Sequence, residues 1–341
     1  MAGLFKMLVK ATRPARKRLR LPAVPALPKM PKPPAIKRMA AGLARRKTQE
    51  SRPPRPAPGS FVADIFACPE GQVSYRFYTP TGSAGRRMPL VVMLHGCSQT
   101  AADFAVGTGM NRLADELGFL VLYPQQSPRA NIGRCWNWHD PRNQARGRGE
   151  PAVIAALTRH AVRLGRANPA RVYIAGISAG GTAAAIIGAA YPDLYAAVGV
   201  HSGVPMGNIR SLRSAVSAMR GKRGPGSTAR LPPQLPTIVF HGDSDPIVHP
   251  SNAGGFLANL ERSRPGPLTC RIASGRTERG REFTQRSYQN RAGRTLLEDW
   301  TVHGSGHGWS GGRAAGSHTD PAGPDASREM LRFFLARRRG G

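Results

Sequence analysis

The sequence predicts an α/β protein with a mostly parallel β-sheet and helices on both of its faces. Short, continuously apolar segments recur from residue 61 onward, and helical stretches separate several of them. Continuous apolar runs are typical of parallel strands, because both faces of such a sheet are covered. Hydrophobic residues make up 40% of the 341 residues, which is enough for a real core. No run of about 18 apolar residues occurs, so no transmembrane helix is expected.

Five predicted strands share one character, each being a run of five to seven mostly apolar residues. They are residues 89–95, 119–123, 171–175, 237–241 and 296–302. Helices are predicted over residues 110–117 and 179–191, the second of which ends at Pro192. Because no internal repeat is apparent, one α/β domain spanning residues 60–338 is the simplest organisation.

Residues 1–59 differ from this domain in charge and composition. They hold 16 of the 50 Lys and Arg residues, 11 of the 31 prolines and a single acid, Glu50. Proline removes a backbone donor, so a disordered basic tail is predicted here rather than a packed domain. Two roles stay open: a tether to an anionic granule or membrane surface, or a solvated tail without a dedicated partner. The positive charge after residue 59 is almost all Arg, a compositional preference that predicts no specific nucleic-acid site.

A G-x-S-x-G motif at residues 176–180 directly follows the third predicted strand and precedes a predicted helix. In that context the glycines permit a tight turn, which projects the serine hydroxyl above the edge of the sheet. The N-terminus of the helix behind it favours negative charge. Ser178 is therefore the candidate nucleophile, and the backbone N–H of Ala179 is a candidate donor to an oxyanion.

A serine nucleophile needs a base that is oriented by an acid, and both are expected after later strands. Asp243 and Asp245 follow the fourth predicted strand, and either one also suits a turn that caps the next segment. His303, His307 and His318 follow the last predicted strand. Glycines on both sides give His307 a mobile, closely approaching loop, which makes it the preferred base.

The first predicted strand leads into residues 95–99, where the backbone N–H of Cys97 is a second candidate oxyanion donor. Gln99 in the same turn is a candidate substrate contact. Trp136 and Trp138 form either an apolar wall for the substrate or part of the core.

Four cysteines allow three full pairings, and no His/Cys cluster has the spacing of a metal site. A disulfide between Cys97 and Cys135 would hold the Trp-containing loop over the candidate site, and two buried thiols are the alternative. The pairing of Cys68 and Cys270 stays open. Neither a metal nor a cofactor is predicted.

Five motifs occur together and in order: LHGCSQ at 94–99, CWNW at 135–138, GISAGG at 176–181, HGDSD at 241–245 and GSGHGWSGG at 304–312. They resemble the poly(3-hydroxybutyrate) depolymerase family of α/β-hydrolase esterases, which also contains feruloyl and acetyl-xylan esterases. The likeness covers about residues 60–336. It implies an α/β-hydrolase fold with Ser178 as nucleophile and His307 as base. The acid of this family lies in a D-x-x-V/I arrangement, which Asp245 fits and which favours it over Asp243.

The resemblance implies a serine esterase that cleaves a poly(3-hydroxybutyrate)-type polyester or a short-chain hydroxyalkanoate ester through an acyl-enzyme. A feruloyl or acetyl-xylan carbohydrate esterase is the alternative within the family, and a granule- or polyanion-binding protein is the alternative of another class. The family also suggests secretion, but Lys6 and Lys10 interrupt the apolar run that a signal peptide would need. Extracellular and cytoplasmic, granule-associated locations therefore both stay open, as does the oligomeric state.

Overall fold

The computed structural model describes residues 59–83, 85–207, 209–222, 235–264 and 266–340. The chain divides into two units, Met1–Glu50 and Ser51–Gly341, and all described residues belong to the second. Except for Gly59, the predicted basic tail lies outside the described residues. None of the helices in the described ranges is long and apolar enough to span a bilayer.

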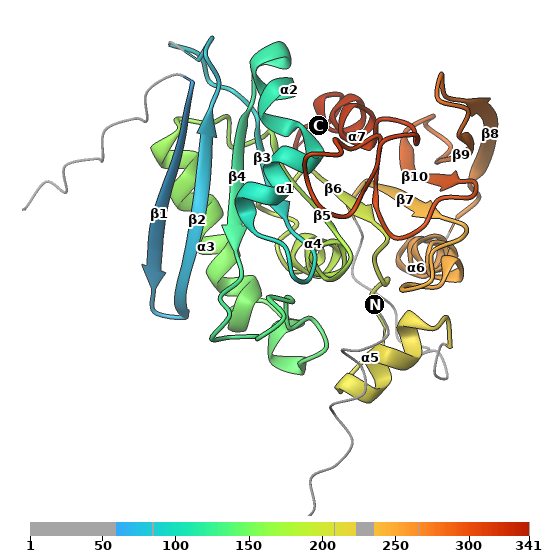
Figure 1. The fold of residues 1–341 in the computed structure, drawn as a ribbon, viewed down its shortest axis with the longest axis horizontal. Helices are drawn as coiled ribbons and strands as arrows, with labels where there is room; N and C mark the ends of the chain where they lie inside the picture. The colour runs from blue at the N-terminus through green and yellow to red at the C-terminus, as the bar shows by residue number, and fades with distance from the viewer. Residues whose placement is uncertain (1–58, 84, 208, 223–234, 265, 341) are drawn as a thin grey trace, which may run out of the picture. The chain divides into compact units, whose positions relative to one another are not determined.

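A large twisted sheet runs through the described unit, with the strand order β1-β2-β4-β3-β5-β6-β7-β10-β9-β8 (Figure 1). The strands in the middle of the sheet are all parallel to one another. They are β4 (Leu120–Gln125), β3 (Leu90–Leu94), β5 (Val172–Ile177), β6 (Ala197–His201), β7 (Thr237–Gly242) and β10 (Thr295–Val302). This arrangement confirms the predicted fold class.

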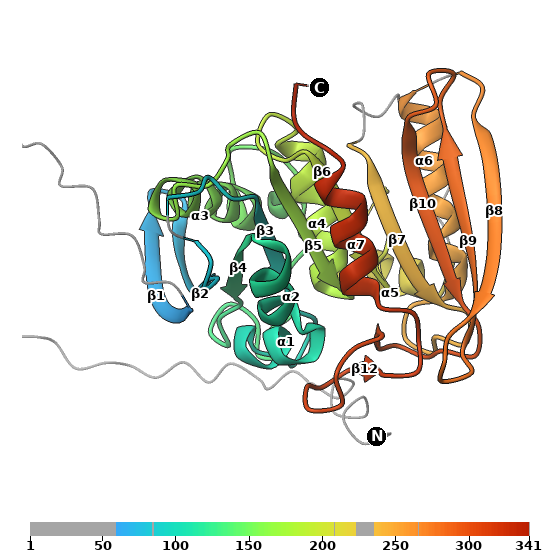
Figure 2. The ribbon, with the colours of Figure 1, turned by 90° about the horizontal axis from the view of Figure 1, so that it is seen from above.

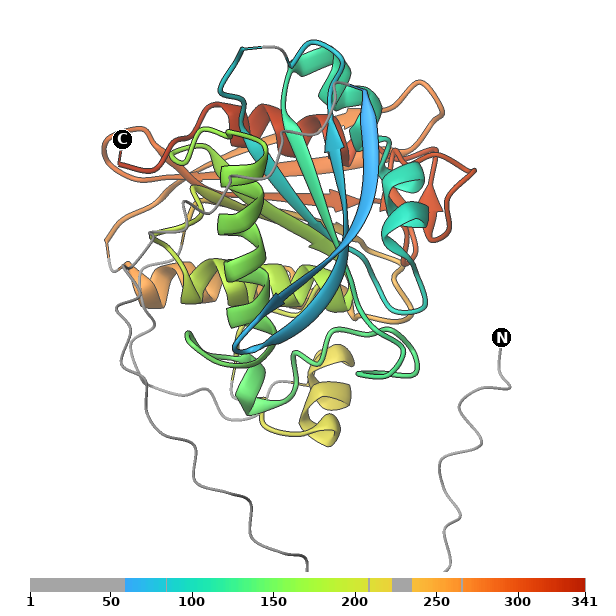
Figure 3. The ribbon, with the colours of Figure 1, turned by 90° about the vertical axis from the view of Figure 1, so that its left-hand side faces the viewer.

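An antiparallel hairpin extends the sheet at each end. The hairpin of β1 (Ser60–Cys68) and β2 (Gly71–Thr79) is strongly twisted and pairs with β4 (Figure 3). The hairpin of β8 (Thr269–Arg276) and β9 (Glu282–Gln289) pairs with β10 at the opposite end. The sequence pattern missed β8 and β9 because β8 is exposed, β9 is half-buried and both are polar, so they carry no continuous apolar run.

Helices cover both faces of the sheet (Figure 2). The side chains of the central strands are therefore buried on both faces, in two separate core clusters. One face packs against α1 (Ala101–Thr108), α2 (Met110–Leu117) and α7 (Ala326–Leu335). The other packs against α3 (Gly149–Leu164), α4 (Ala179–Ala190) and α6 (Gly254–Ser263), and two alanines of α5 (Leu212–Met219) join the core on this side. All five residues of β3 are 0% exposed, as expected for a central strand between two helical layers.

The predicted elements agree closely with the structure. The five predicted strands appear as β3, β4, β5, β7 and β10, with bounds that differ by at most two residues, and the two predicted helices are α2 and α4. The strand β6 was not predicted. It has only five residues, Ala197–His201, and a central glycine, so its apolar run is short.

Candidate active site

The candidate nucleophile, acid and base follow the carboxyl ends of three parallel strands. Ser178 follows β5, Asp245 lies three residues beyond β7, and His307 lies five residues beyond β10. In the sheet these strands are ordered β5-β6-β7-β10. Carboxyl ends of parallel strands meet at one edge of a sheet, which is where such folds hold their ligands.

Ser178 occupies a strained turn between β5 and α4. Its backbone has φ 57° and ψ −125°, a conformation with positive φ that residues with a Cβ rarely adopt. The adjacent glycines are a steric requirement. A Cβ at Gly176 would lie 2.5 Å from the carbonyl oxygen of Leu94, and one at Gly180 would lie 2.2 Å from the same atom. The close approach of helix and strand therefore permits only glycine at these positions, while the turn presents the serine.

Asp245 and His307 form a short, buried hydrogen bond. His307 Nδ1 lies 2.7 Å from Asp245 Oδ2, and the two side chains are 12% and 0% exposed. The other carboxylate oxygen accepts the backbone N–H groups of Ile247 and Val248, each at 2.9 Å. Burial by itself would raise the pKa of Asp245, but the bonds from His241 and His307 outweigh it and lower that pKa below its ordinary value. Asp245 is therefore an oriented, ionised carboxylate behind the imidazole.

The buried His201 links the turn of Ser178 to the loop of His307. The carbonyl oxygen of His201 accepts the N–H of Ser178 at 2.9 Å, and its Nε2 accepts the N–H of Ser310 at 2.9 Å. Burial, together with nearby His241 and His307, lowers the pKa of His201 to about 3, so its ring is neutral. The sequence did not predict this role, because β6 was not predicted and the partner Ser310 lies more than 100 residues away. His201 stands in a His-Ser-Gly stretch at residues 201–203, and no other sequence feature marks it.

The turn after β3 passes directly beside the nucleophile. A Cβ built at Gly96 would lie 3.5 Å from Cβ of Ser178. The backbone N–H groups of Cys97 and Ala179 have no acceptor among the described residues, so both are free to donate to a bound oxyanion. These are the two donors that the sequence predicts.

Gln99 stabilises this turn from within the protein. Its Oε1 accepts the N–H of Gly96 at 2.9 Å, and its Nε2 donates to Asp103 Oδ2 and to the carbonyl oxygen of Ser317, each at 3.1 Å. The side chain is 3% exposed. Both ends of the amide are bonded to protein groups. Gln99 therefore stabilises the turn and is not placed for the substrate contact that was expected from the sequence.

Cys97 and Cys135 form a disulfide, with their sulfur atoms 2.07 Å apart. The N–H of Ser98 also donates to the carbonyl oxygen of Gly133 at 2.7 Å. These two links hold the loop of residues 127–135 against the turn after β3. Cys68 and Cys270, whose pairing the sequence left open, are free thiols.

The two tryptophans that follow this loop lie mostly in the core. Trp136 is 2% exposed, and its Nε1 donates to the carbonyl oxygen of His95 at 3.0 Å. Trp138 is 7% exposed and lines a cavity of about 60 Å³ together with Ile186, Met206 and Ile209. Both tryptophans thus have the burial of the core alternative, and Trp136 also lines a cavity, together with Glu150 and Val153.

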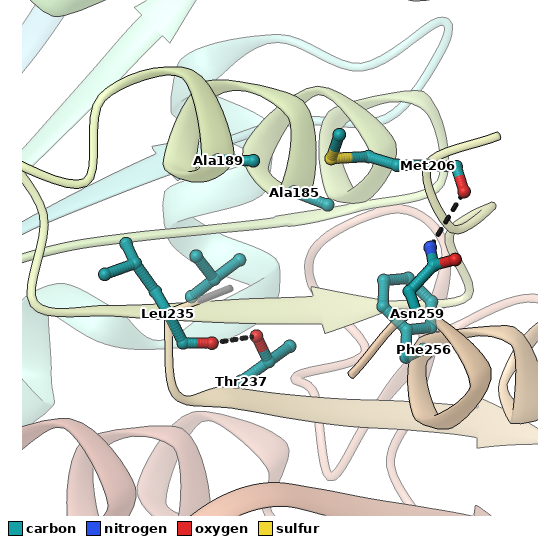
Figure 4. Close-up of a pocket in the computed structure, with 8 residues that line it drawn as sticks. Ala185, Ala189, Met206, Leu235, Thr237, Phe256 and Asn259 are labelled. Carbon is teal, nitrogen blue, oxygen red and sulfur yellow. Dashed lines mark hydrogen bonds between the residues drawn. The ribbon is translucent and has the colours of Figure 1, made fainter. Parts of the chain in front are cut away.

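A second small cavity lies between α4 and α6, and Met206 lines this one as well (Figure 4). Its volume is about 20 Å³, which has room for roughly one water molecule. Asn259 Nδ2 donates to the carbonyl oxygen of Met206 at 2.8 Å and closes one side of it (Figure 4). This cavity is a packing void and is too small to hold an ester substrate.

The alternative acid and base, Asp243 and His303, form a pair of their own. His303 Nδ1 lies 2.8 Å from Asp243 Oδ2, and His303 Nε2 lies 2.9 Å from Thr284 Oγ1. The side chains of His303 and Asp243 are 40% and 37% exposed. Within the described ranges, no group of three His, Cys, Asp or Glu side chains could hold a metal ion.

Comparisons with known proteins agree with this architecture. A family model described as "Esterase PHB depolymerase" matches residues 73–264. Poly(3-hydroxyalkanoate) depolymerase C of Paucimonas lemoignei is 30% identical over 254 residues, which cover 71% of this chain and 60% of that protein. Feruloyl esterase B of Neurospora crassa is 29% identical over 181 residues, covering 47% of this chain and 60% of that protein.

A solved structure, an acetyl xylan esterase from Aspergillus awamori, has the same fold with a TM-score of 0.57. It is 19% identical and covers 81% of this chain and 98% of its own. The matches to the depolymerase and to the feruloyl esterase each span 60% of the relative's length. The resemblance of the five sequence motifs is therefore confirmed, and the chain belongs to the poly(3-hydroxybutyrate) depolymerase family of α/β-hydrolase esterases.

Proposed function

We propose that this protein is a serine esterase that hydrolyses hydroxyalkanoate esters or polyesters through an acyl-enzyme. The observation that carries the proposal is the buried Asp245–His307 bond of 2.7 Å at the same sheet edge as the strained turn of Ser178. A nucleophile, a base and an orienting acid are the minimum set for this chemistry.

In the first half of the reaction, Ser178 Oγ attacks the ester carbonyl while His307 Nε2 accepts the hydroxyl proton. His307 Nδ1–H donates to Asp245, which selects the tautomer that leaves Nε2 free and stabilises the imidazolium that forms. The N–H groups of Cys97 and Ala179 donate to the oxyanion of the tetrahedral intermediate. His307 then gives the proton to the departing alcohol, and the acyl group stays on Ser178.

In the second half, water takes the place of the alcohol. His307 accepts a proton from the water as its oxygen attacks the acyl carbonyl, and the same two N–H groups stabilise the second oxyanion. Collapse of the intermediate releases the carboxylic acid, and the proton returns to Ser178. No step requires a metal or a cofactor.

The name of the 30% identical relative, a poly(3-hydroxyalkanoate) depolymerase, supports a hydroxyalkanoate substrate. A carbohydrate esterase is the second candidate, since a feruloyl esterase and acetylxylan esterases are 29% identical. A panel of hydroxybutyrate oligomers, 4-nitrophenyl esters of graded length and methyl ferulate separates the two. The hydroxybutyrate oligomers should give the highest kcat/KM, whereas a preference for methyl ferulate would favour the second candidate.

The mechanism is tested at Ser178. Replacing it with alanine should lower kcat by up to about 10⁶-fold, the scale of triad loss. A fluorophosphonate probe should label the native protein but not Ser178→Ala. Labelling of both proteins to the same extent would show that another residue is the nucleophile.

A further inference from the structure

Ser98 and His318 face each other from two loops beside the candidate active site. Ser98 Oγ lies 3.4 Å from His318 Nε2, and both side chains are exposed. Their backbones have φ 64° and φ 53°, the left-handed region that favours glycine. Two non-glycine residues in this conformation and in mutual contact are unusual, and such strain tends to gather at functional sites.

The protein holds the loop of His318 with several hydrogen bonds. Asp103 accepts the N–H of Ser317 at 2.9 Å and its hydroxyl at 2.5 Å. Gln99 Nε2 donates to the carbonyl oxygen of Ser317, and the N–H of Trp309 donates to the carbonyl oxygen of His318 at 2.7 Å. The imidazole therefore projects from a braced loop, although its ring is exposed.

Ser98 and His318 each adjoin a segment that carries part of the candidate reaction centre. Ser98 directly follows Cys97, the proposed oxyanion donor. His318 is tied to Trp309, which lies two residues after the proposed base His307. A group bound between Ser98 and His318 would therefore lie beside the segments that carry the candidate oxyanion donor and the candidate base.

The hydrogen-bonding capacity of the pair suits a hydroxyl group. Ser98 Oγ donates its proton to the carbonyl oxygen of Cys97 at 2.5 Å, so toward His318 it can only accept. His318 Nε2 must then carry the hydrogen, but 3.4 Å is a long contact that a ligand oxygen can replace. A hydroxyl can donate to Ser98 Oγ and accept from His318 Nε2–H at the same time, whereas an alkyl group can do neither.

We propose that Ser98 and His318 form a specificity site that binds a hydroxyl group of the substrate next to the scissile ester. This inference rests on the proposed esterase function and adds the class of ester that the site selects. The hydroxyl has two possible sources, the acyl part of a hydroxyacyl ester or the alcohol part of a sugar ester. Both present the same chemistry to Ser98 and His318.

Two matched substrate pairs test the site and identify the source. The first compares 4-nitrophenyl 3-hydroxybutyrate with 4-nitrophenyl butyrate, and the second compares an acetylated methyl xyloside with cyclohexyl acetate. In the native protein, kcat/KM should favour the hydroxylated member of one pair. That preference should fall about fivefold in His318→Ala, the scale of one hydrogen bond, and His318→Gln, which keeps an N–H donor, should restore part of it.

Ser98→Gly is the second variant, because glycine keeps the left-handed backbone and removes only the hydroxymethyl group. It should lose the same preference, whereas His303→Ala, the matched exposed histidine, should retain it. The pair of substrates that loses its preference identifies the source of the hydroxyl. An unchanged preference in both variants, or no preference in the native protein, would overturn the site. Absence of hydrolysis of 4-nitrophenyl butyrate by the native protein would count against the proposed function instead.

Discussion

The Asp245–His307 and Asp243–His303 pairs start from the same two strands, β7 and β10, and their bonds are almost equally short. The Nδ1–Oδ2 distances are 2.7 Å and 2.8 Å. The pairs differ in burial, since the first has side chains that are 0% and 12% exposed and the second has side chains that are 37% and 40% exposed. They also differ in the surroundings of Nε2, the second ring nitrogen of each histidine.

Burial makes the Asp245–His307 pair effective in orienting the imidazole. Both oxygens of Asp245 are bonded, and its side chain is 0% exposed, so electrostatic interactions are stronger there and the carboxylate cannot rotate. In the more exposed Asp243–His303 pair, called the outer pair below, water and salt compete for the carboxylate and the imidazole. His303 Nε2 meets Thr284, which lies within strand β9 rather than on an exposed strand-to-helix turn. An Asp and a His at suitable spacing are therefore not enough to identify a catalytic pair.

The largest expected difference between the pairs is kinetic. Asp245→Asn should lower kcat about 10⁴-fold, because loss of the orienting acid leaves the imidazole in the wrong tautomer. Asp243→Asn should lower kcat less than about tenfold, since an exposed pair contributes little. Steady-state kinetics on one soluble ester measures both values, and thermal unfolding checks that each variant is folded. If Asp243→Asn were the more damaging change, the roles of the two pairs would be reversed.

The disulfide holds the turn that carries the candidate oxyanion donor Cys97, and its removal should have the next largest effect. The bridge joins residues 38 positions apart, for which chain entropy gives roughly 4 kcal/mol of stabilisation. Unfolding of the Cys97→Ser/Cys135→Ser double variant measures this loss. The matched control is Cys68→Ser/Cys270→Ser, which removes two free thiols and should change stability little. Free thiols at both Cys97 and Cys135 in folded, air-oxidised protein would contradict the prediction.

Burial of His95 should also make the stability of the folded protein depend on pH. Burial lowers the pKa of His95 to about 4 in the folded protein, below its ordinary value of about 6.5 in the unfolded chain. The unfolded chain therefore binds the proton more readily, so stability is complete above about pH 6.5 and falls as the pH drops toward 4. Between pH 6.5 and 5 the loss is about 2 kcal/mol for this residue.

Urea unfolding at several pH values measures this dependence on acid. His95→Gln keeps an acceptor for the N–H of Gln126, which donates to His95 Nε2 at 3.0 Å, and should flatten the dependence on pH. An unchanged dependence on pH in His95→Gln would show that His95 is not its source.

The smallest expected effect is the contribution of the outer pair to stability. A double-mutant cycle of Asp243→Asn and His303→Gln at pH 5.5 should give a coupling below about 1 kcal/mol, as exposed ion pairs do. The coupling should shrink between 0.05 M and 0.5 M salt, because screening acts on exposed charges. A coupling that is large and insensitive to salt would place this pair in the same class as Asp245–His307.

The sequence predicted those parts of the molecule that local patterns record. Continuous apolar runs identified the central strands β3, β4, β5, β7 and β10, because a strand between two helical layers needs apolar residues on both sides. The motif around Ser178 predicted a strand-to-helix turn, since only glycine fits at Gly176 and Gly180. The half-exposed strands β8 and β9 were missed because their environment leaves no apolar run.

The choice between Asp243 and Asp245 could not be made from local sequence patterns. Both residues follow the same strand with turn-forming neighbours, so spacing alone could not separate them, and the family resemblance was needed. The roles of Gln99 and His201 depend on partners more than 100 residues away, such as Ser317 and Ser310. No local pattern encodes which distant loop will supply such a partner.

Local sequence patterns were enough to establish the class of fold, the position of the strained serine turn and the set of residues available for acid–base chemistry. These depend on backbone sterics and on apolar periodicity, which act over a few neighbouring residues. Which Asp–His pair is buried and which amides remain free beside Ser178 depend on the tertiary structure. So do the hydrogen bonds by which Gln99 stabilises the turn after β3 and the contact between Ser98 and His318. Burial and hydrogen-bond partners are set when distant strand ends converge at one edge of the sheet, and that convergence is a property of the whole fold.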